Sequence, residues 1–147
     1  MRIILGSDHA GFALKEVLIA YLRERGFEVE DKGPSSYDEA DDYPDFTVPV
    51  ARAVAEDATA RGIIIGGSGQ GEAIAANRIK GVRTTVYYGG NTEVLRIARE
   101  HNDANVLSLG ARFMSEDEAK EAVMLWLETP FSGAERHIRR INKIDAA

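Results

Sequence analysis

Short hydrophobic runs alternate with longer amphipathic stretches along the whole chain. The hydrophobic runs predict five β-strands, at Ile3–Leu5, Phe27–Val29, Ile63–Ile65, Val82–Val86 and Asn105–Leu109. Several of these runs are almost continuously apolar, which is typical of strands in a sheet that is covered on both faces. The repeated alternation of strand and helix patterns therefore predicts an α/β fold, a three-layer sandwich with a five-stranded parallel sheet and helices on both faces.

The amphipathic stretches predict six helices, which are a Leu14–Leu22 stripe, Phe46–Glu56, Ala73–Lys80, Val94–Glu100, a helix opened by Ser115, and Arg136–Asp145. Arg25 and Gly26 close the first helix, because a basic last turn followed by glycine is a stop signal. Ser115 and Glu118 form a capping box at the fifth helix, and Pro49 is tolerable only near a first turn.

The one long polar connection is Asp31–Asp45, which holds two prolines and six acidic residues. It is too short to link two domains, so we interpret it as a surface loop near the site. Without internal repeats or low-complexity tracts, the 147 residues are expected to form a single domain, 1–147.

Composition narrows the possible functions. The chain has no cysteine, which excludes a disulfide framework, a thiolate zinc site and a thiol nucleophile. Its net charge of −6 disfavours nucleic acid or an anionic membrane as a partner. The apolar run at the N-terminus is too short for a signal peptide, and no stretch is long enough to span a membrane. We therefore expect a soluble, cytoplasmic protein.

The chemically unusual residues directly follow three of the predicted strands, at Gly6–Gly11, Gly66–Glu72 and Gly110–Arg112. In a parallel α/β sheet, ligands bind beyond the carboxyl ends of the strands. These three segments are therefore the candidate site.

The segment from Gly67 to Gly71 has a glycine at every second position. Such a loop lets backbone N–H groups approach an anion, although a tight turn with close helix–sheet packing explains it equally well. A dinucleotide fingerprint would need a glycine at position 72, and a P-loop would need Lys-Ser/Thr after Gly11, so both nucleotide hypotheses fail. Glu72 is either a carboxylate that compensates a helix dipole or a general base at the mouth of the loop.

The three histidines have no metal-ligand spacing, so we expect no metal site. Asp8 and His9 can be a capping pair or site residues. His101 and Asn102 can likewise be a helix C-terminal cap or part of a site. His137, which stands among arginines, is expected to be a solvated surface residue.

Arg136 and Arg140 are four residues apart and so share one helical face. They form either a solvated basic face or a phosphate clamp, since guanidinium groups suit phosphate geometry. In an acidic chain this basic segment is a local exception, which favours the clamp.

Together these segments resemble the type B ribose-5-phosphate isomerases and the wider family that includes the galactose-6-phosphate isomerase subunits. The stretches that carry the resemblance run in the same order from the first strand to the last helix, and they are Gly6–Gly11, Asp42–Asp45, Gly67–Arg78, His101–Asn105, Gly110–Arg112 and Glu135–His137. The resemblance implies a Rossmann-like sheet and a reversible aldose–ketose isomerisation of a sugar phosphate. One branch of the family uses a cysteine base at the position of Gly66. This sequence resembles the other branch, whose base is the glutamate at position 72.

The chemistry of such a reaction fits the residues. A carboxylate at Glu72 can move a proton between C1 and C2 of an open-chain sugar through a cis-enediolate. The N–H groups of Gly67, Ser68, Gly69, Gln70 and Gly71 can stabilise the developing oxyanion, and the Ser68 hydroxyl can shuttle a proton between O1 and O2. No cofactor and no metal is required.

The remaining roles concern the ring and the phosphate. The resemblance implies that His101 is the acid that opens the sugar ring, with Asp8 as its candidate partner and Asn102 holding a sugar hydroxyl. The phosphate would be bound by cationic groups, which are His9, Arg112, Arg136 and Arg140. A tetrose or hexose phosphate remains an alternative substrate, because these residues act at atoms that all such sugars share. A non-catalytic sugar-phosphate-binding module is a third hypothesis.

The position of His101 predicts a partner. Glu72 follows a strand at the carboxyl edge of the sheet, whereas His101 follows a helix that runs back by about 15 Å. The two residues should lie at opposite ends of one subunit. We therefore expect a homodimer with two shared active sites, and pairing of dimers into a tetramer stays open.

Overall fold

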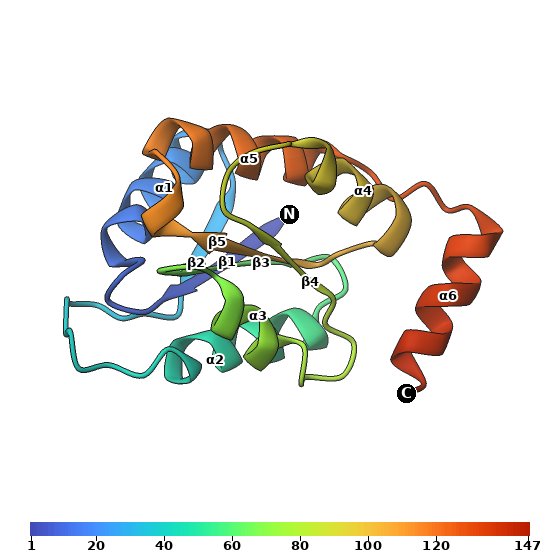
Figure 1. The fold of residues 1–147 in the computed structure, drawn as a ribbon, viewed down its shortest axis with the longest axis horizontal. Coiled ribbons are helices and arrows are strands. Elements are labelled where there is room, and N and C mark those ends of the chain that lie inside the picture. Colours follow the sequence, from blue (N-terminus) through green and yellow to red (C-terminus); the bar gives the residue numbers. More distant parts are fainter.

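Five parallel strands form one sheet in the computed structural model, which covers residues 1–147 (Figure 1). The strands are β1 (Arg2–Ser7), β2 (Glu28–Asp31), β3 (Arg61–Gly66), β4 (Thr84–Tyr87) and β5 (Val106–Gly110). Their order across the sheet is β2-β1-β3-β5-β4. The predicted α/β sandwich is confirmed, and β1, β3 and β5 are neighbours at the centre of the sheet.

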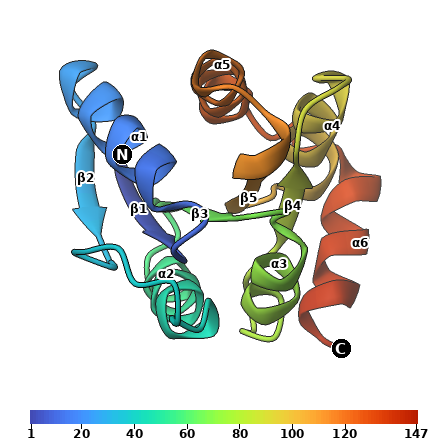
Figure 2. The ribbon, with the colours of Figure 1, turned by 60° about the vertical axis from the view of Figure 1, so that its left-hand side comes forward.

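Helices cover both faces of the sheet. They are α1 (Phe12–Glu24), α2 (Pro44–Glu56), α3 (Gln70–Ala76), α4 (Glu93–Asn102), α5 (Glu116–Glu128) and α6 (Glu135–Asp145), with a short 3₁₀ turn, η1 (Ala111–Phe113), after β5. Figure 2 shows α1, α5 and α4 on one face and α2 and α3 on the other. Helix α6 lies apart from both layers, beside α4 at the β4 end of the sheet (Figures 1 and 2). No helix is long and apolar enough to cross a membrane.

The central strands are mostly apolar because each supplies side chains to two cores. In β3, Ile63 and Ile65 join the larger core under α1, α4 and α5, whereas Ile64 joins the smaller core over α2 and α3. Successive side chains of a strand point to opposite faces, so a strand covered on both sides has no solvent-facing positions. The fully buried Ser108 is the polar exception in β5. Trp126 of α5 is the largest fully buried side chain of the larger core.

The predicted helix signals are confirmed where local chemistry defines them. The Ser115 hydroxyl accepts a hydrogen bond from the N–H of Glu118 at 3.1 Å, as a capping box requires. Helix α1 ends at Glu24, Arg25 is its C-cap, and Gly26 then adopts a left-handed φ of 85°. The polar connection forms a loop between β2 and α2, the β2–α2 loop (residues 32–43).

Several boundaries differ from those predicted. Helix α2 begins at Pro44, two residues earlier than expected, so Pro49 lies in its second turn rather than near its start. Helix α3 spans Gln70–Ala76 instead of 73–80. Asn77, the next residue, accepts a hydrogen bond from the Thr84 N–H at 2.8 Å, which ties the end of α3 to the start of β4. Val82 precedes β4 rather than beginning it, and its side chain fills the smaller core.

Candidate active site

The segments that follow β1, β3 and β5 meet at the carboxyl edge of the sheet. The N–H of Asp8 donates to the carbonyl of Ile65 at 3.2 Å, which ties the end of β1 to β3. The N–H of Arg112 donates to the carbonyl of Gly67 at 3.1 Å, which ties the turn after β5 to the glycine loop. The structure therefore brings Asp8, His9, the Gly67–Gly71 loop, Glu72 and Arg112 together, and we call these residues the catalytic-edge group.

Glu72 lies in the first turn of α3, and only 4% of its surface is exposed. Its carboxylate occupies the space beside Gly66, where a Cβ atom would lie 1.8 Å from Oε1. Burial raises the pKa of this carboxyl group, and the nearby charge of Asp8 raises it further. A desolvated carboxylate with a raised pKa is suited to accept and return a proton near neutral pH.

The glycine loop holds unpaired backbone donors beside this carboxylate. Gly69 adopts a left-handed φ of 78°, and the Ser108 hydroxyl donates to its carbonyl at 2.6 Å. The N–H groups of Gly67, Ser68 and Gly69 donate to no acceptor within the protein. The Ser68 hydroxyl is half-buried and accepts a hydrogen bond from the Gln70 N–H at 3.3 Å. Fixed N–H donors of this kind can stabilise an oxyanion.

Arg112 and His9 lie beside the loop, at the ends of two neighbouring segments. The Arg112 guanidinium lies so close to Gly67 that a Cβ there would come within 3.0 Å of Nη1. Nδ1 of His9 lies 2.7 Å from a carboxylate oxygen of Asp41. That hydrogen bond is the main cause that raises the pKa of His9, and the charge of Asp8 adds to it. The catalytic-edge group thus combines the Glu72 carboxylate with the Arg112 guanidinium and with an imidazole whose pKa is raised.

Sequence reasoning missed two residues that the β2–α2 loop brings to this group. Asp41 contacts His9, and Tyr43 covers the glycine loop, where a Cβ on Gly71 would lie 2.6 Å from the phenol ring. Tyr43 stands in one of the stretches that carry the family resemblance, which was the available signal for it. Asp41 is one of several acidic residues in a polar loop, and nothing in the pattern marks it.

The other candidates lie elsewhere, on α4 and α6. His101 and Asn102 form the last turn of α4 instead of a loop, and the left-handed residue is Asp103, with a φ of 45°. The His101 ring stacks on that of His137 with centroids 4.3 Å apart and an interplanar angle of 17°.

This stack overturns the expectation that His137 is a solvated surface residue, because only 4% of His137 is exposed. Burial lowers its pKa, and the neighbouring charge of Arg136 lowers it further. Arg136 and Arg140 are exposed on α6, and neither forms an ion pair within the chain. We call His101, Asn102, Arg136 and Arg140 the α4–α6 group.

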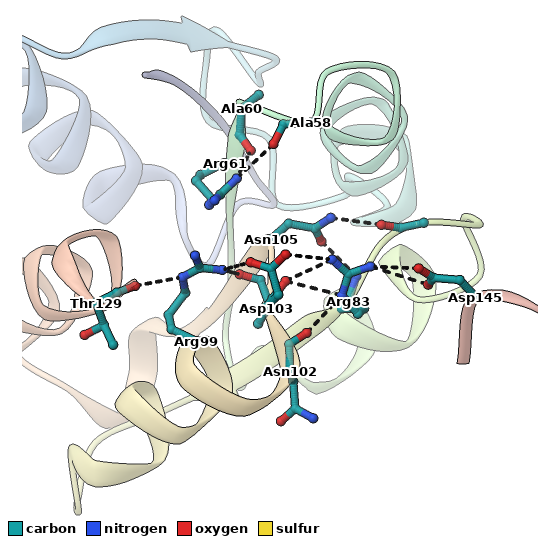
Figure 3. A network of polar contacts seen from close by, with 12 residues as sticks. Ala58, Ala60, Arg61, Arg83, Arg99, Asn102, Asp103, Asn105, Thr129 and Asp145 are labelled. Atoms are coloured by element: carbon teal, nitrogen blue, oxygen red, sulfur yellow. Dashed lines mark hydrogen bonds and ion pairs between the residues drawn. The ribbon is translucent and has the colours of Figure 1, made fainter. Parts of the chain in front are cut away.

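A polar network centred on the buried Arg99 and the partly buried Arg83 fixes the end of α4 (Figure 3). Arg99 donates to the carbonyls of Thr129 at 3.1 Å and Ala104 at 2.7 Å and to the Asp103 carboxylate at 2.8 Å. Arg83 donates to the Asn102 carbonyl at 2.9 Å and forms an ion pair with Asp145 of α6 at 3.2 Å. The network holds α4, the start of β4 and the end of α6 in one arrangement.

The two groups lie at opposite edges of the sheet. In the strand register, Thr84 at the start of β4 is level with Gly62, because both pair with Val106. Arg83, which holds the end of α4, is therefore level with Arg61, five residues before Gly66, or about 16 Å along the strands. One subunit alone does not bring Glu72 and His101 together.

Comparison with known proteins gives the class of this fold and site. The chain belongs to the Ribose/Galactose Isomerase family, whose profile matches residues 3–144. It is 44% identical over 142 residues to ribose-5-phosphate isomerase B of Mycolicibacterium paratuberculosis, covering 97% of this chain and 88% of that protein. It is 42% identical over 145 residues to the Escherichia coli enzyme of the same name, with coverage of 99% and 95%.

Solved structures agree with the sequence relatives. Ribose-5-phosphate isomerase B from Mycoplasma genitalium with bound ribulose 5-phosphate superposes with a TM-score of 0.93 at 39% identity, covering 99% of this chain and 94% of that one. The Clostridium thermocellum protein gives the same TM-score of 0.93 at 44% identity, with coverage of 99% and 96%. The resemblance found in the sequence is confirmed, and the chain is an isomerase of this family.

Proposed function

We propose that this chain interconverts D-ribose 5-phosphate and D-ribulose 5-phosphate through a cis-enediolate. The observation that carries the proposal is the buried Glu72 carboxylate, seated beside Gly66 and next to the unpaired N–H groups of the glycine loop. The similarity to a solved relative with bound ribulose 5-phosphate supports the choice of a pentose phosphate.

Glu72 acts as the base in this proposal. It removes the proton from C2 of the open-chain aldose and delivers it to C1, so that one carboxylate serves both carbons. The Ser68 hydroxyl donates a proton to O1 and accepts the proton of O2, which balances the transfer at carbon. The N–H groups of Gly67 and Gly69 stabilise the oxyanion, and removal of one such donor typically costs about 3–4 kcal/mol of transition-state stabilisation.

Ring opening and substrate binding fall to the other residues. His101 protonates the ring oxygen, Asp8 takes part in moving the hydroxyl proton as the ring opens, and Asn102 holds a sugar hydroxyl. The phosphate lies between cations of both groups, with His9 and Arg112 from one and Arg136 and Arg140 from the other. Exposed arginines that lack a carboxylate partner in the chain fit an anionic ligand.

A second copy of the chain completes the site. Strand β4 is an edge strand, and exposed apolar side chains gather on the elements around it, which are Ile74, Tyr88, Val94, Ile97, Phe113 and Ile138. Helix α6 stands off the body at this same end (Figure 2). A twofold dimer that buries these apolar side chains can place the α4–α6 group of one subunit against the catalytic-edge group of the other, in two equivalent sites.

A coupled isomerase assay without added metal tests the substrate. We expect the highest kcat/KM for ribose 5-phosphate in a set with allose 6-phosphate, galactose 6-phosphate and erythrose 4-phosphate. A clear preference for one of the other sugars would replace the proposed substrate but keep the chemistry. Binding without turnover of any of them would favour a non-catalytic sugar-phosphate module. The Glu72→Gln protein serves as the control for contaminating isomerase.

A further inference from the structure

The side chain of Asp41 forms hydrogen bonds only with His9. Only 6% of this side chain is exposed, although it belongs to a polar surface loop. Its Oδ1 lies 2.7 Å from Nδ1 of His9 and accepts the His9 backbone N–H at 3.2 Å. Its Oδ2 is buried without a hydrogen-bond partner. The carboxylate therefore has one neutralising neighbour, the imidazole.

This contact decides which nitrogen of His9 carries a proton. An ionised carboxylate can only accept hydrogen bonds, so Nδ1 of His9 must be the donor. A neutral imidazole has a single N–H, and with that proton on Nδ1 the other nitrogen presents a lone pair. His9 can then donate a hydrogen bond outward, from Nε2, only when it is an imidazolium.

The surroundings of His9 favour that charged form. Asp41 of the β2–α2 loop and Asp8 after β1 both raise the pKa of His9, while partial burial and Arg112 of η1 oppose them. The Tyr37 ring meets the imidazole edge-on with centroids 6.1 Å apart. A buried carboxylate next to a neutral ring would be left without a counter-charge, which is costly. With 26% of its side chain exposed, His9 is accessible to a ligand, and Arg112 lies close enough to affect its pKa.

We propose that Asp41 is a positioning residue for phosphate recognition, which fixes the proton on Nδ1 of His9 so that His9 meets the substrate phosphate as a cation whose Nε2–H donates to a phosphate oxygen. This inference rests on the proposed function, in which His9 is a phosphate ligand. It implies that phosphate affinity falls once His9 loses its proton, because the lone pair of Nε2 then faces the anion. The steps at C1 and C2 are unaffected, because they take place away from the phosphate.

The kinetic test compares Asp41→Asn with Glu39→Gln, an exposed neighbour in the same loop that removes one carboxylate without touching His9. Near neutral pH we expect Asp41→Asn to raise KM by about three- to tenfold with kcat almost unchanged, because a charge-assisted hydrogen bond becomes a neutral one. The rise of KM with pH should also begin at a lower pH than in the wild type. Glu39→Gln should match the wild type in both respects. A KM profile of Asp41→Asn that coincides with the wild type would overturn the proposal.

Nitrogen NMR of labelled imidazoles tests the same point without relying on turnover. Above the pKa of His9, the wild-type signal should show the proton on Nδ1, and a wild-type proton on Nε2 would contradict the proposal. Titration with inorganic phosphate should show weaker binding to Asp41→Asn than to the wild type, and equal binding at all pH values would also contradict it. If the wild type binds phosphate through His9 but does not isomerise ribose 5-phosphate, the proposed function fails while the role of Asp41 stands.

Discussion

Glu72 can occupy its place only because residue 66 has no side chain. A Cβ on residue 66 would overlap the Glu72 carboxylate, with 1.8 Å to Oε1 and 2.5 Å to Oε2. The same position holds the cysteine base in the other branch of the family, as the sequence resemblance implies. In this geometry a side chain at position 66 and the carboxylate at position 72 compete for the same space, so a residue other than glycine at position 66 would displace the carboxylate.

Replacement of Glu72 by glutamine should abolish most turnover and spare binding. The amide keeps the shape of the side chain but cannot accept the proton, so kcat should fall by about 10²–10⁴-fold, the usual share of a positioned base. KM should change little.

The same substitution tests the pH dependence. Because burial raises the pKa of Glu72 and the base must be ionised, the wild-type kcat/KM should decline as pH falls through that raised pKa, earlier than for an ordinary glutamate. The residual activity of Glu72→Gln should lack this decline, and retention of more than about a tenth of the wild-type rate would remove Glu72 from the mechanism.

Gly66→Ala tests the position of the Glu72 carboxylate rather than its ability to accept a proton. The added methyl group displaces the carboxylate, so kcat should fall by about tenfold or more even though every catalytic side chain is still present. In the Glu72→Gln background the same substitution should cost much less, because residues that act as a unit are not additive. Equal losses in both backgrounds would show that Gly66 acts through some other contact.

Single residues were predictable from the sequence where a motif or strand end marks them. Asp8, Glu72 and Arg112 each follow a strand, and the parallel topology alone brings them to one edge. Asp41 and His137 were not predictable, since one is an acid in an acidic loop and the other a histidine among arginines. Their burial comes from tertiary contacts with His9 and His101, which local pattern does not encode.

At the level of elements, the C-terminal end of α4 depends on Arg99. Its guanidinium is almost fully buried and satisfies two backbone carbonyls and the Asp103 carboxylate. Arg99→Met should lower the free energy of unfolding by about 2–4 kcal/mol, because it leaves buried acceptors without a donor. Arg96→Met on the exposed face of the same helix should change it by no more than about 0.5 kcal/mol. Urea unfolding of the two variants checks this, and equal stabilities would contradict the role given to the network.

A second prediction at the level of elements concerns the exposed basic face of α6. A phosphate far from the reacting carbons is held similarly in the ground and transition states, so Arg140→Ala should raise KM more than it lowers kcat. Arg139→Ala, at the preceding residue of the same helix, serves as the matched control and should leave KM nearly unchanged. Steady-state kinetics of both variants decide the matter. If KM of Arg140→Ala also stays at the wild-type value, the basic face of α6 is merely solvated.

The elements themselves were largely predictable, and their ends less so. The apolar runs identified β1, β3 and β5 because these central strands are buried on both faces, and they also marked the partly buried edge strands β2 and β4. The capping box identified the start of α5. Helix α3 was misplaced because its start depends on the left-handed Gly69 and its end on the contact between Asn77 and Thr84. The contact between Asn77 and Thr84 joins a side chain at the end of α3 to the backbone of β4. Hydrophobic periodicity within a single segment cannot predict such a contact.

On the scale of the whole molecule, the sequence predicted the separation of Glu72 and His101 from the direction of one helix, and the strand register supports it. The position of α6 was not predictable, since nothing in its pattern shows that it stands off the sheet beside α4 (Figure 1). In the proposed dimer, each subunit supplies its α4–α6 group to the catalytic-edge group of the other. The position of α6 beside α4 would serve that contact.

Subunit mixing tests this central claim most directly. Glu72→Gln and His101→Asn proteins, each expected to have little activity alone, are mixed, dissociated and reassembled, with wild type treated in the same way as the reference. Random pairing makes half of the dimers mixed, and each mixed dimer has one site with both residues intact and one with neither. Shared sites therefore predict recovery of about a quarter of the wild-type activity. If both residues served a site within one subunit, every site would carry a lesion, and mixing would restore no activity.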